Sequence, residues 1–68
     1  MKAVSGKDFA RLLQQRDWVL RRISGSHHIY GKDGSAVRIS LPIHGNIPLK
    51  IGLQKHLMKI AGIEEGEL

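Results

Sequence analysis

The sequence contains no cysteine, only two prolines, and a single copy each of Phe, Trp and Tyr. Without cysteine the chain has no disulfide, no thiolate nucleophile and no cysteine-type zinc site. No apolar run approaches the roughly 18 residues of a membrane-spanning helix, and the N-terminus lacks the apolar core of a signal peptide. We therefore expect a soluble, cytoplasmic protein.

The chain is also short. Its 68 residues predict one domain spanning residues 1–68. A domain of this size buries only about 60% of the surface that its unfolded chain exposes. A deep, enclosed active site does not fit in such a chain, so any chemistry is expected on an open face or in a shallow groove.

Negative charge is scarce as well. Eleven Lys and Arg face six Asp and Glu, which gives a net charge of +5 and a pI near 10.1. Three of the six carboxylates, Glu64, Glu65 and Glu67, lie at the C-terminus, so the rest of the chain is more basic than the total indicates. This balance favours a polyanionic partner, nucleic acid above all.

The apolar pattern predicts a helix at each end of the chain. The first covers residues 6–16, with Ser5 as N-cap and Asp8 completing a variant capping box. The second begins near residues 49–50, and Gly62 ends it in a Schellman-type cap. Its predicted core stripe consists of Leu53, Leu57, Ile60 and Ala61.

Three strands are predicted between the helices, at residues 18–23, 27–32 and 36–41. The order α-β-β-β-α predicts an α+β fold, a three-stranded antiparallel sheet with both helices on one face.

The Asp33-Gly34 pair predicts a two-residue type I′ hairpin, which sets the register of the last two strands. In that register His27 lies opposite Ser40 and His28 lies opposite Ile39. Because opposed residues share a face, Val37, Ile39 and Leu41 take His28 and Tyr30 into the core with them. His27 is then on the open face, with Arg38 diagonal to it on the neighbouring strand.

An imidazole on a rigid strand of a basic protein can transfer a proton near neutral pH. His27 is accordingly a candidate general acid or base, and the alternative is an ordinary solvated histidine. A metal site is not favoured, because His27 and His28 point to opposite faces of the sheet. His44 and His56 are distant in the sequence.

Several cations are candidate contacts to RNA phosphates. Lys50 is set near a helix N-terminus, where backbone N–H groups also attract anions. Each of these residues could instead be a solvated surface charge. The candidates are Arg21, Arg22, Arg38, Lys50, Lys55 and Lys59.

The motifs together resemble the HicA-type toxins of toxin-antitoxin pairs, the YcfA-like family. The resemblance rests on Gly25-Ser26-His27, the Pro42-Ile43-His44-Gly45 loop and the terminal Ala61-Gly62-Ile63. It implies a fold like that of a double-stranded-RNA-binding domain and an mRNA interferase, an endoribonuclease that needs no metal or other cofactor. His27 corresponds to the catalytic histidine. mRNA is the implied substrate and a HicB-type antitoxin the implied partner, with no membrane and no small-molecule cofactor.

Supporting roles follow for the residues around His27. Gly25 permits close backbone approach, Ser26 orients the start of the strand, and Arg38 or Lys50 binds phosphate. His44 occupies the Pro-x-His position of the family. Two rival functions remain, a non-catalytic RNA-binding module of the same fold and a protein-interaction domain whose positive charge serves an acidic antitoxin.

Overall fold

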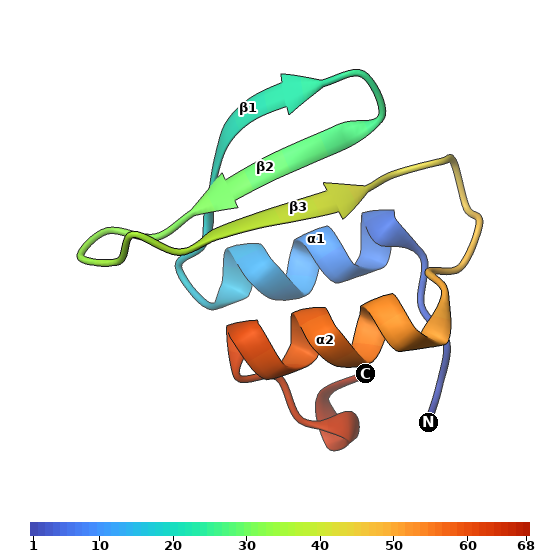
Figure 1. Cartoon of the computed structure of the whole chain (residues 1–68). Coiled ribbons are helices and arrows are strands. Elements are labelled where there is room, and N and C mark those ends of the chain that lie inside the picture. Colours follow the sequence, from blue (N-terminus) through green and yellow to red (C-terminus); the bar gives the residue numbers. More distant parts are fainter.

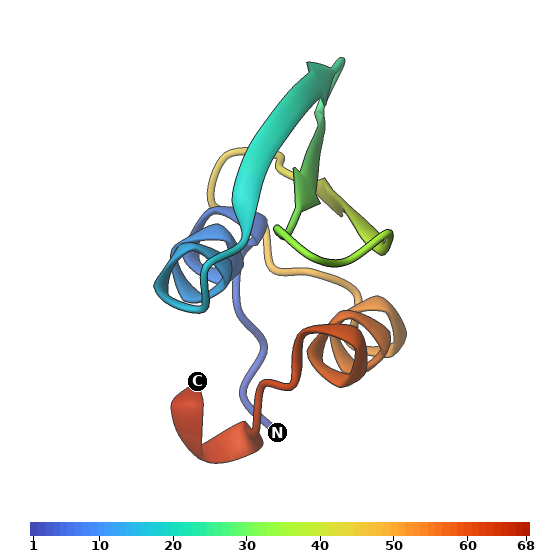
Figure 2. The same ribbon diagram turned by 90° about the vertical axis from the view of Figure 1, so that its left-hand side faces the viewer.

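A computed structural model describes residues 1–68, and the elements follow the predicted order α-β-β-β-α (Figure 1). The sheet is antiparallel with the strand order β1-β2-β3, and both helices lie on one side of it (Figures 1 and 2). The predicted α+β fold is therefore confirmed. The elements are α1 (Gly6–Gln15), β1 (Val19–Ser24), β2 (His27–Gly31), β3 (Arg38–Pro42), α2 (Ile51–Ala61) and a short 3-10 helix, η1 (Glu65–Glu67).

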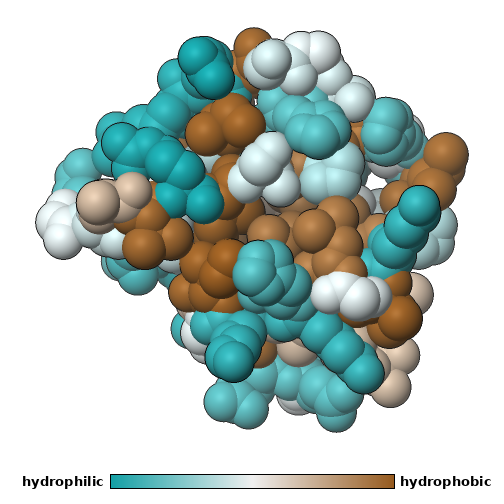
Figure 3. All heavy atoms as spheres, viewed as in Figure 1, coloured by the Kyte–Doolittle hydropathy of each residue, from teal (hydrophilic) through white to brown (hydrophobic).

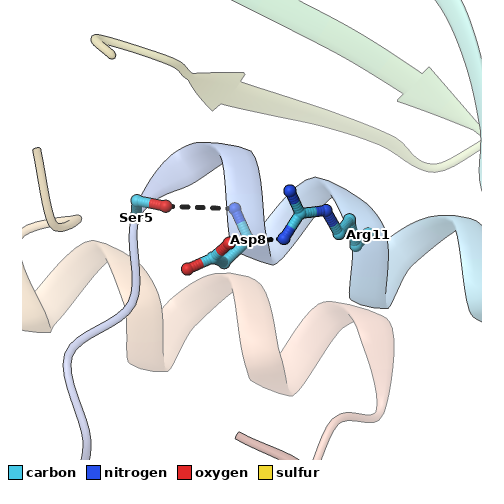
Figure 4. A network of polar contacts seen from close by, with 3 residues as sticks. All are labelled: Ser5, Asp8 and Arg11. Atoms are coloured by element: carbon cyan, nitrogen blue, oxygen red, sulfur yellow. Dashed lines mark hydrogen bonds and ion pairs between the residues drawn. The ribbon is translucent and has the colours of Figure 1, made fainter. Parts of the chain in front are cut away.

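Helix α1 begins where its sequence predicts. The Ser5 hydroxyl accepts a hydrogen bond from the Asp8 backbone N–H at 3.1 Å, which satisfies one of the free donors of the first turn (Figure 4). The Asp8 carboxylate does not return to the Ser5 backbone. It accepts from Arg11 at 2.9 Å, so only half of the predicted capping box forms.

Helix α1 ends in a Schellman motif that the sequence did not reveal. Asp17 has φ of 68°, and the Trp18 N–H donates to the Leu13 carbonyl at 3.0 Å. This backbone turn carries Trp18 into the core, directly before β1.

The two-residue hairpin of the sheet lies between β1 and β2. Ser24 pairs with His27, and Gly25 and Ser26 form the turn. Gly25 has φ of 60°, and a positive φ at the first central residue alone is the pattern of a type II′ turn, for which glycine is preferred. Along the same ladder, a β-bulge falls between Leu20 and Arg22.

The predicted hairpin at Asp33-Gly34 is wrong. Residues 32–37 form a longer connection, in which Gly34 has φ of 82° but Asp33 does not have the positive φ that a type I′ turn needs. Local bonds remove this segment from the ladder. The Ser35 N–H donates to the Lys32 carbonyl, and the Ser35 hydroxyl accepts a hydrogen bond from the Val37 N–H.

The register between β2 and β3 is consequently shifted by two residues from the predicted one. His28 pairs with Leu41 instead of Ile39, and Tyr30 pairs with Ile39 instead of Val37. Val37, predicted in the core, leaves the sheet and is 46% exposed. Side chains alternate with a period of two, so the shift leaves every paired residue on its predicted face.

The core lies between the sheet and the helices. Tyr30, Ile39 and Leu41 enter it from the sheet, and Phe9 and Leu13 enter it from α1. Apolar surface is not fully enclosed, because a band of it reaches the exterior between the sheet and α2 (Figure 3). Neither helix combines the length and apolar character that crossing a bilayer requires.

Of the four residues predicted for the core stripe of α2, Leu57 is in the core and Leu53 and Ala61 pack against it, but Ile60 does not. Gln54, Leu57 and Met58 are its buried residues, while Ile60 is 36% exposed. The helix is rotated so that Gln54, which is fully buried, reaches the N-terminal segment. The end of α2 is as predicted: Gly62 has φ of 71°, and the Ile63 N–H bonds to the Met58 carbonyl.

Gln54 joins α2 to the segment before α1. Its side-chain carbonyl accepts from the Val4 N–H at 3.0 Å, and its amide donates to the Lys2 carbonyl at 2.7 Å. The Leu49 N–H completes the junction by donating to the Val4 carbonyl. These bonds give partners to the buried backbone of Val4 and to the partly buried Lys2 carbonyl.

Candidate active site

His27 lies on the face of the sheet that the helices leave open. Its ring is exposed, whereas the ring of His28, the next residue, is half-buried on the helix side. His27 Nδ1 lies 3.2 Å from the Ser40 hydroxyl oxygen. This contact orients the imidazole, and no hydrogen bond engages Nε2 in the structure. The predicted placement of His27 on the open face agrees with this geometry.

The backbone around His27 is held by the C-terminal end of β3. Pro42 is the ladder partner of His27, and the Ile43 N–H donates to the Ser26 carbonyl at 2.8 Å. The first turn of α1 packs against Pro42. A methyl group at Gly6 would overlap the Pro42 carbonyl oxygen, so only glycine allows this close approach. Ser26 thus orients the start of β2 through its carbonyl.

Arg38 is not where the sequence places it. It pairs with Gly31, four residues along β2 from His27, instead of lying diagonal to His27. The two-residue shift of β3 is the cause, and it brings Ser40 to the position diagonal to His27. Arg38 stays on the open face but is too far along the strand to reach a group bound at His27.

Arg22 is the cation that the observed register brings near His27. It pairs with Ile29 on the open face, while Ser24 pairs with His27, so Arg22 is diagonal to His27 across β1 and β2. Diagonal neighbours lie within reach of long side chains. The sequence holds a signal for this placement. A two-residue turn at Gly25-Ser26 pairs Ser24 with His27, and counting back along β1 from that pair sets Arg22 opposite Ile29.

His44 and Lys50 lie together on a different part of the surface. Both line a groove of about 340 Å³ with Pro42, Ile47, Pro48, Leu49 and Leu53. Lys50 is the N-cap of α2, whose first turn has neither a side-chain cap nor an acidic residue. The helix dipole at this end is therefore not neutralised. No hydrogen bond joins this groove to His27, and Pro42 is the residue that the two share.

Charge is distributed unevenly between the two sides of the molecule. The C-terminal segment with Glu64, Glu65 and Glu67 lies on the helix side, opposite the open face of the sheet (Figures 1 and 2). Glu67 forms an ion pair with Arg16 there. Arg21, Arg22 and Arg38 belong to the sheet, so its open face keeps a positive potential.

No group of three His, Asp or Glu side chains lies close enough together to hold a metal ion. At His27 the arrangement is an exposed imidazole, oriented by the Ser40 hydroxyl and diagonal to Arg22, which can transfer a proton.

Comparison with known proteins agrees with the motifs. A family model described as HicA toxin of bacterial toxin-antitoxin matches residues 6–63. The match includes both helices and all three strands, together with Gly25, Ser26 and His27. None of the curated proteins compared with the chain matches it.

Proposed function

The chain belongs to the HicA toxin family, and from that premise we propose that it is an endoribonuclease that cleaves mRNA with His27 as its catalytic residue. A toxin of this class has a cognate antitoxin, and we expect a HicB-type protein in that role. The observation that carries the proposal is the exposed His27 ring, held through Nδ1 by Ser40 on the open face of a basic sheet.

The proposed reaction needs one proton acceptor at a ribose. With its proton on Nδ1, His27 donates to the Ser40 hydroxyl and leaves Nε2 free to accept the proton of a 2′-hydroxyl. The 2′ oxygen attacks the adjacent phosphorus, and the bond from phosphorus to the 5′ oxygen breaks. The imidazolium returns the proton to that leaving oxygen, giving a 2′,3′-cyclic phosphate and a 5′-hydroxyl end.

The surrounding residues have supporting roles. Arg22, diagonal to His27, is set to neutralise charge that builds on the attacked phosphate. Gly25 supplies the positive φ of the hairpin turn, and a Cβ there would meet no atom within 4 Å, so the backbone beside His27 is open to a substrate. Lys50 and His44 bind the RNA strand where it passes the start of α2.

The test compares two adjacent histidines on opposite faces. His27→Ala is expected to lower the cleavage rate of purified protein on a defined RNA by at least about 100-fold, the usual contribution of a general acid–base group. His28→Ala, which changes the neighbouring residue on the helix side, is expected to retain cleavage. Circular dichroism spectra establish that both variants are folded.

The same assay separates the rival functions. An RNA whose scissile ribose lacks the 2′-hydroxyl is expected to bind but not to be cleaved. A His27→Ala variant as active as the parent removes His27 from the mechanism. Parent protein that binds RNA and never cleaves it identifies the chain as a non-catalytic RNA-binding module.

A further inference from the structure

Two arginines from opposite edges of the sheet meet over a glycine of the central strand. A Cβ atom at Gly31 of β2 would lie 2.9 Å from Nη1 of Arg38 and 3.0 Å from Nε of Arg21. Gly31 does not have a positive φ, so its backbone conformation does not require glycine. What the position lacks is room for a side chain, because the two guanidinium groups occupy it.

The two guanidinium groups form one concentrated positive site. Since both approach the same point above Gly31, their nearest atoms are no more than about 6 Å apart, a separation at which like charges repel. Asp33 relieves part of this repulsion by pairing with Arg21 at 2.9 Å, but its side chain is 97% exposed. Arg38 has no acidic partner, and its Nη1 donates only to the Val37 carbonyl at 3.3 Å.

The bulge in β1 explains how Arg21 reaches this face. Arg22 faces outward as the partner of Ile29, and a regular strand would turn Arg21 to the opposite side. The irregularity between Leu20 and Arg22 places both arginines on the open face, since Arg21 contacts the space above Gly31. A bulge that redirects a side chain in this manner is a recurrent device near functional sites.

The site is separated from His27 by a defined distance. Gly31 is four residues from His27 on the same strand and on the same face, which corresponds to about 13 Å. One phosphate group cannot contact both places. An RNA strand that follows β2 would place the reacting phosphate at His27 and a later or earlier phosphate at the two arginines.

We propose that Arg21 and Arg38, converging over Gly31, form a second phosphate-binding subsite that holds the RNA strand a few nucleotides away from His27. This inference rests on the proposed function, because it assigns the ligand as the same RNA. Guanidinium groups bind phosphate oxygens through paired N–H donors, and a phosphate between them removes their mutual repulsion. The Asp33 carboxylate competes with the phosphate for Arg21, and the Arg21–Asp33 ion pair breaks when the phosphate binds.

The first experiment measures binding of a fluorescent single-stranded RNA as a function of salt. All variants carry His27→Ala, so that cleavage does not interfere. Arg21→Gln and Arg38→Gln are each expected to raise Kd about tenfold. Each is also expected to reduce the salt slope by about 0.7, the value for one phosphate contact on a single strand. Lys7→Gln, at an exposed position of α1 outside the candidate RNA contacts, is the matched control for loss of one surface charge, and its slope is expected to stay that of the parent.

The double variant identifies a shared phosphate. If both arginines hold the same phosphate, Arg21→Gln combined with Arg38→Gln reduces the slope by the same amount as either single change, about 0.7. Two independent surface cations instead reduce the slope additively, by about 1.4, and that result overturns the proposal.

Gly31→Ala tests the geometry without altering charge. The added methyl group displaces the guanidinium end of Arg38 and the Arg21 side chain from its Cγ outward, with no backbone atom among its nearest contacts. The fold is therefore expected to stay intact while Kd rises about fivefold. Gly52→Ala is the control, because a Cβ at Gly52 meets nothing within 4 Å. Asp33→Asn is expected to tighten RNA binding by freeing Arg21.

These outcomes are independent of the catalytic proposal. Should His27→Ala retain full cleavage, the binding series is repeated with an RNA that lacks the 2′-hydroxyl at the scissile ribose, so the contact at Arg21 and Arg38 is still measured. Unchanged RNA binding by the double arginine variant overturns the subsite. The same holds if that variant loses affinity only for the antitoxin, in which case these arginines belong to a protein interface.

Discussion

Ser40 shows how a single hydroxyl can set the chemistry of the site at the residue scale. Its contact to His27 Nδ1, at 3.2 Å, is the only hydrogen bond of that ring. In the proposed mechanism Ser40 is a positioning residue, which acts through the imidazole instead of touching the reacting atoms.

Replacing Ser40 tests this role. Ser40→Ala is expected to lower kcat for RNA cleavage by about tenfold, because a misoriented base reacts more slowly, while KM stays unchanged. Ser40→Thr keeps the hydroxyl and is expected to restore the rate. Equal losses in the Ala and Thr variants, or a change confined to KM, would contradict a positioning role.

Tyr30 connects a single residue to the stability of the fold. Its ring is 2% exposed, and burial raises the pKa of its phenol above the ordinary value of 10.0 because the charged form is poorly solvated. The folded state thus holds this proton more tightly than the unfolded state. The resulting stability is complete below pH 10 and is lost as pH rises from there through the folded pKa.

Tyr30→Phe removes this titration. The free energy of unfolding of the parent is expected to fall more steeply above pH 10 than that of Tyr30→Phe, measured by urea unfolding at a series of pH values. Because the two proteins differ only at this residue, the difference between the curves isolates Tyr30. Parallel curves would show that the phenol ionises as easily in the folded as in the unfolded chain.

The helix ends offer a matched comparison at the scale of elements. Both helices end in a left-handed residue, Asp17 after α1 with φ of 68° and Gly62 after α2 with φ of 71°. Glycine adopts this conformation without strain, whereas a residue with a Cβ does so at a cost of about 1 kcal/mol.

Opposite effects are expected from exchanging the residue types. Asp17→Gly is expected to stabilise the protein by about 0.5 kcal/mol, and Gly62→Ala to destabilise it by about 1 kcal/mol. Thermal unfolding measures both changes. Destabilisation by Asp17→Gly would mean that the Asp17 side chain, and not only its backbone, supports the end of α1.

The elements also show which parts of the fold are readable from the sequence. The strand order and the assignment of faces follow from alternation, which a shift of two residues does not disturb, so His27 is predicted on the open face despite the wrong register. The conformation of the loop at residues 32–37 cannot be predicted from alternation. Besides its local Ser35 bonds, the loop makes contacts that need the tertiary structure, namely the Arg21–Asp33 ion pair and the placement of Lys32 over the Trp18 ring.

The site is predictable only in part for the same reason. The catalytic role of His27 and the role of His44 stay predictions from the family motifs, and phosphate binding by Lys50 stays a prediction from its place near a helix N-terminus. Neighbours across strands need the register, so Arg38 was placed beside His27 in error and Arg22 was not recognised there. The bulge that redirects Arg21 leaves no clear sign in the local sequence.

Gln54 links residues from opposite ends of the chain and so acts at the scale of the whole molecule. It is fully buried and satisfies the backbone of Lys2 and Val4, about fifty residues away in sequence. These bonds position the segment that leads into α1. The first residue of α1, Gly6, packs against Pro42 at the end of β3, and Pro42 is the ladder partner of His27.

Gln54→Leu is expected to lower the free energy of unfolding by about 2 kcal/mol, because it leaves two backbone groups without hydrogen-bond partners. Urea unfolding measures the loss, and Gln14→Leu at an exposed position of α1 is the control. Equal stability of Gln54→Leu and the parent would show that water replaces the glutamine at Val4 and Lys2.

At the scale of the whole molecule, His27 is the exposed imidazole on the positively charged open face of the sheet, and the proposed function depends on that ring carrying out the proton transfer. The most direct measurement is RNA cleavage by His27→Ala with and without added imidazole, beside the parent protein. We expect cleavage to be lost in the variant and partly restored by free imidazole, which can enter an open site. Cleavage by His27→Ala at the parent rate, without imidazole, would contradict the account.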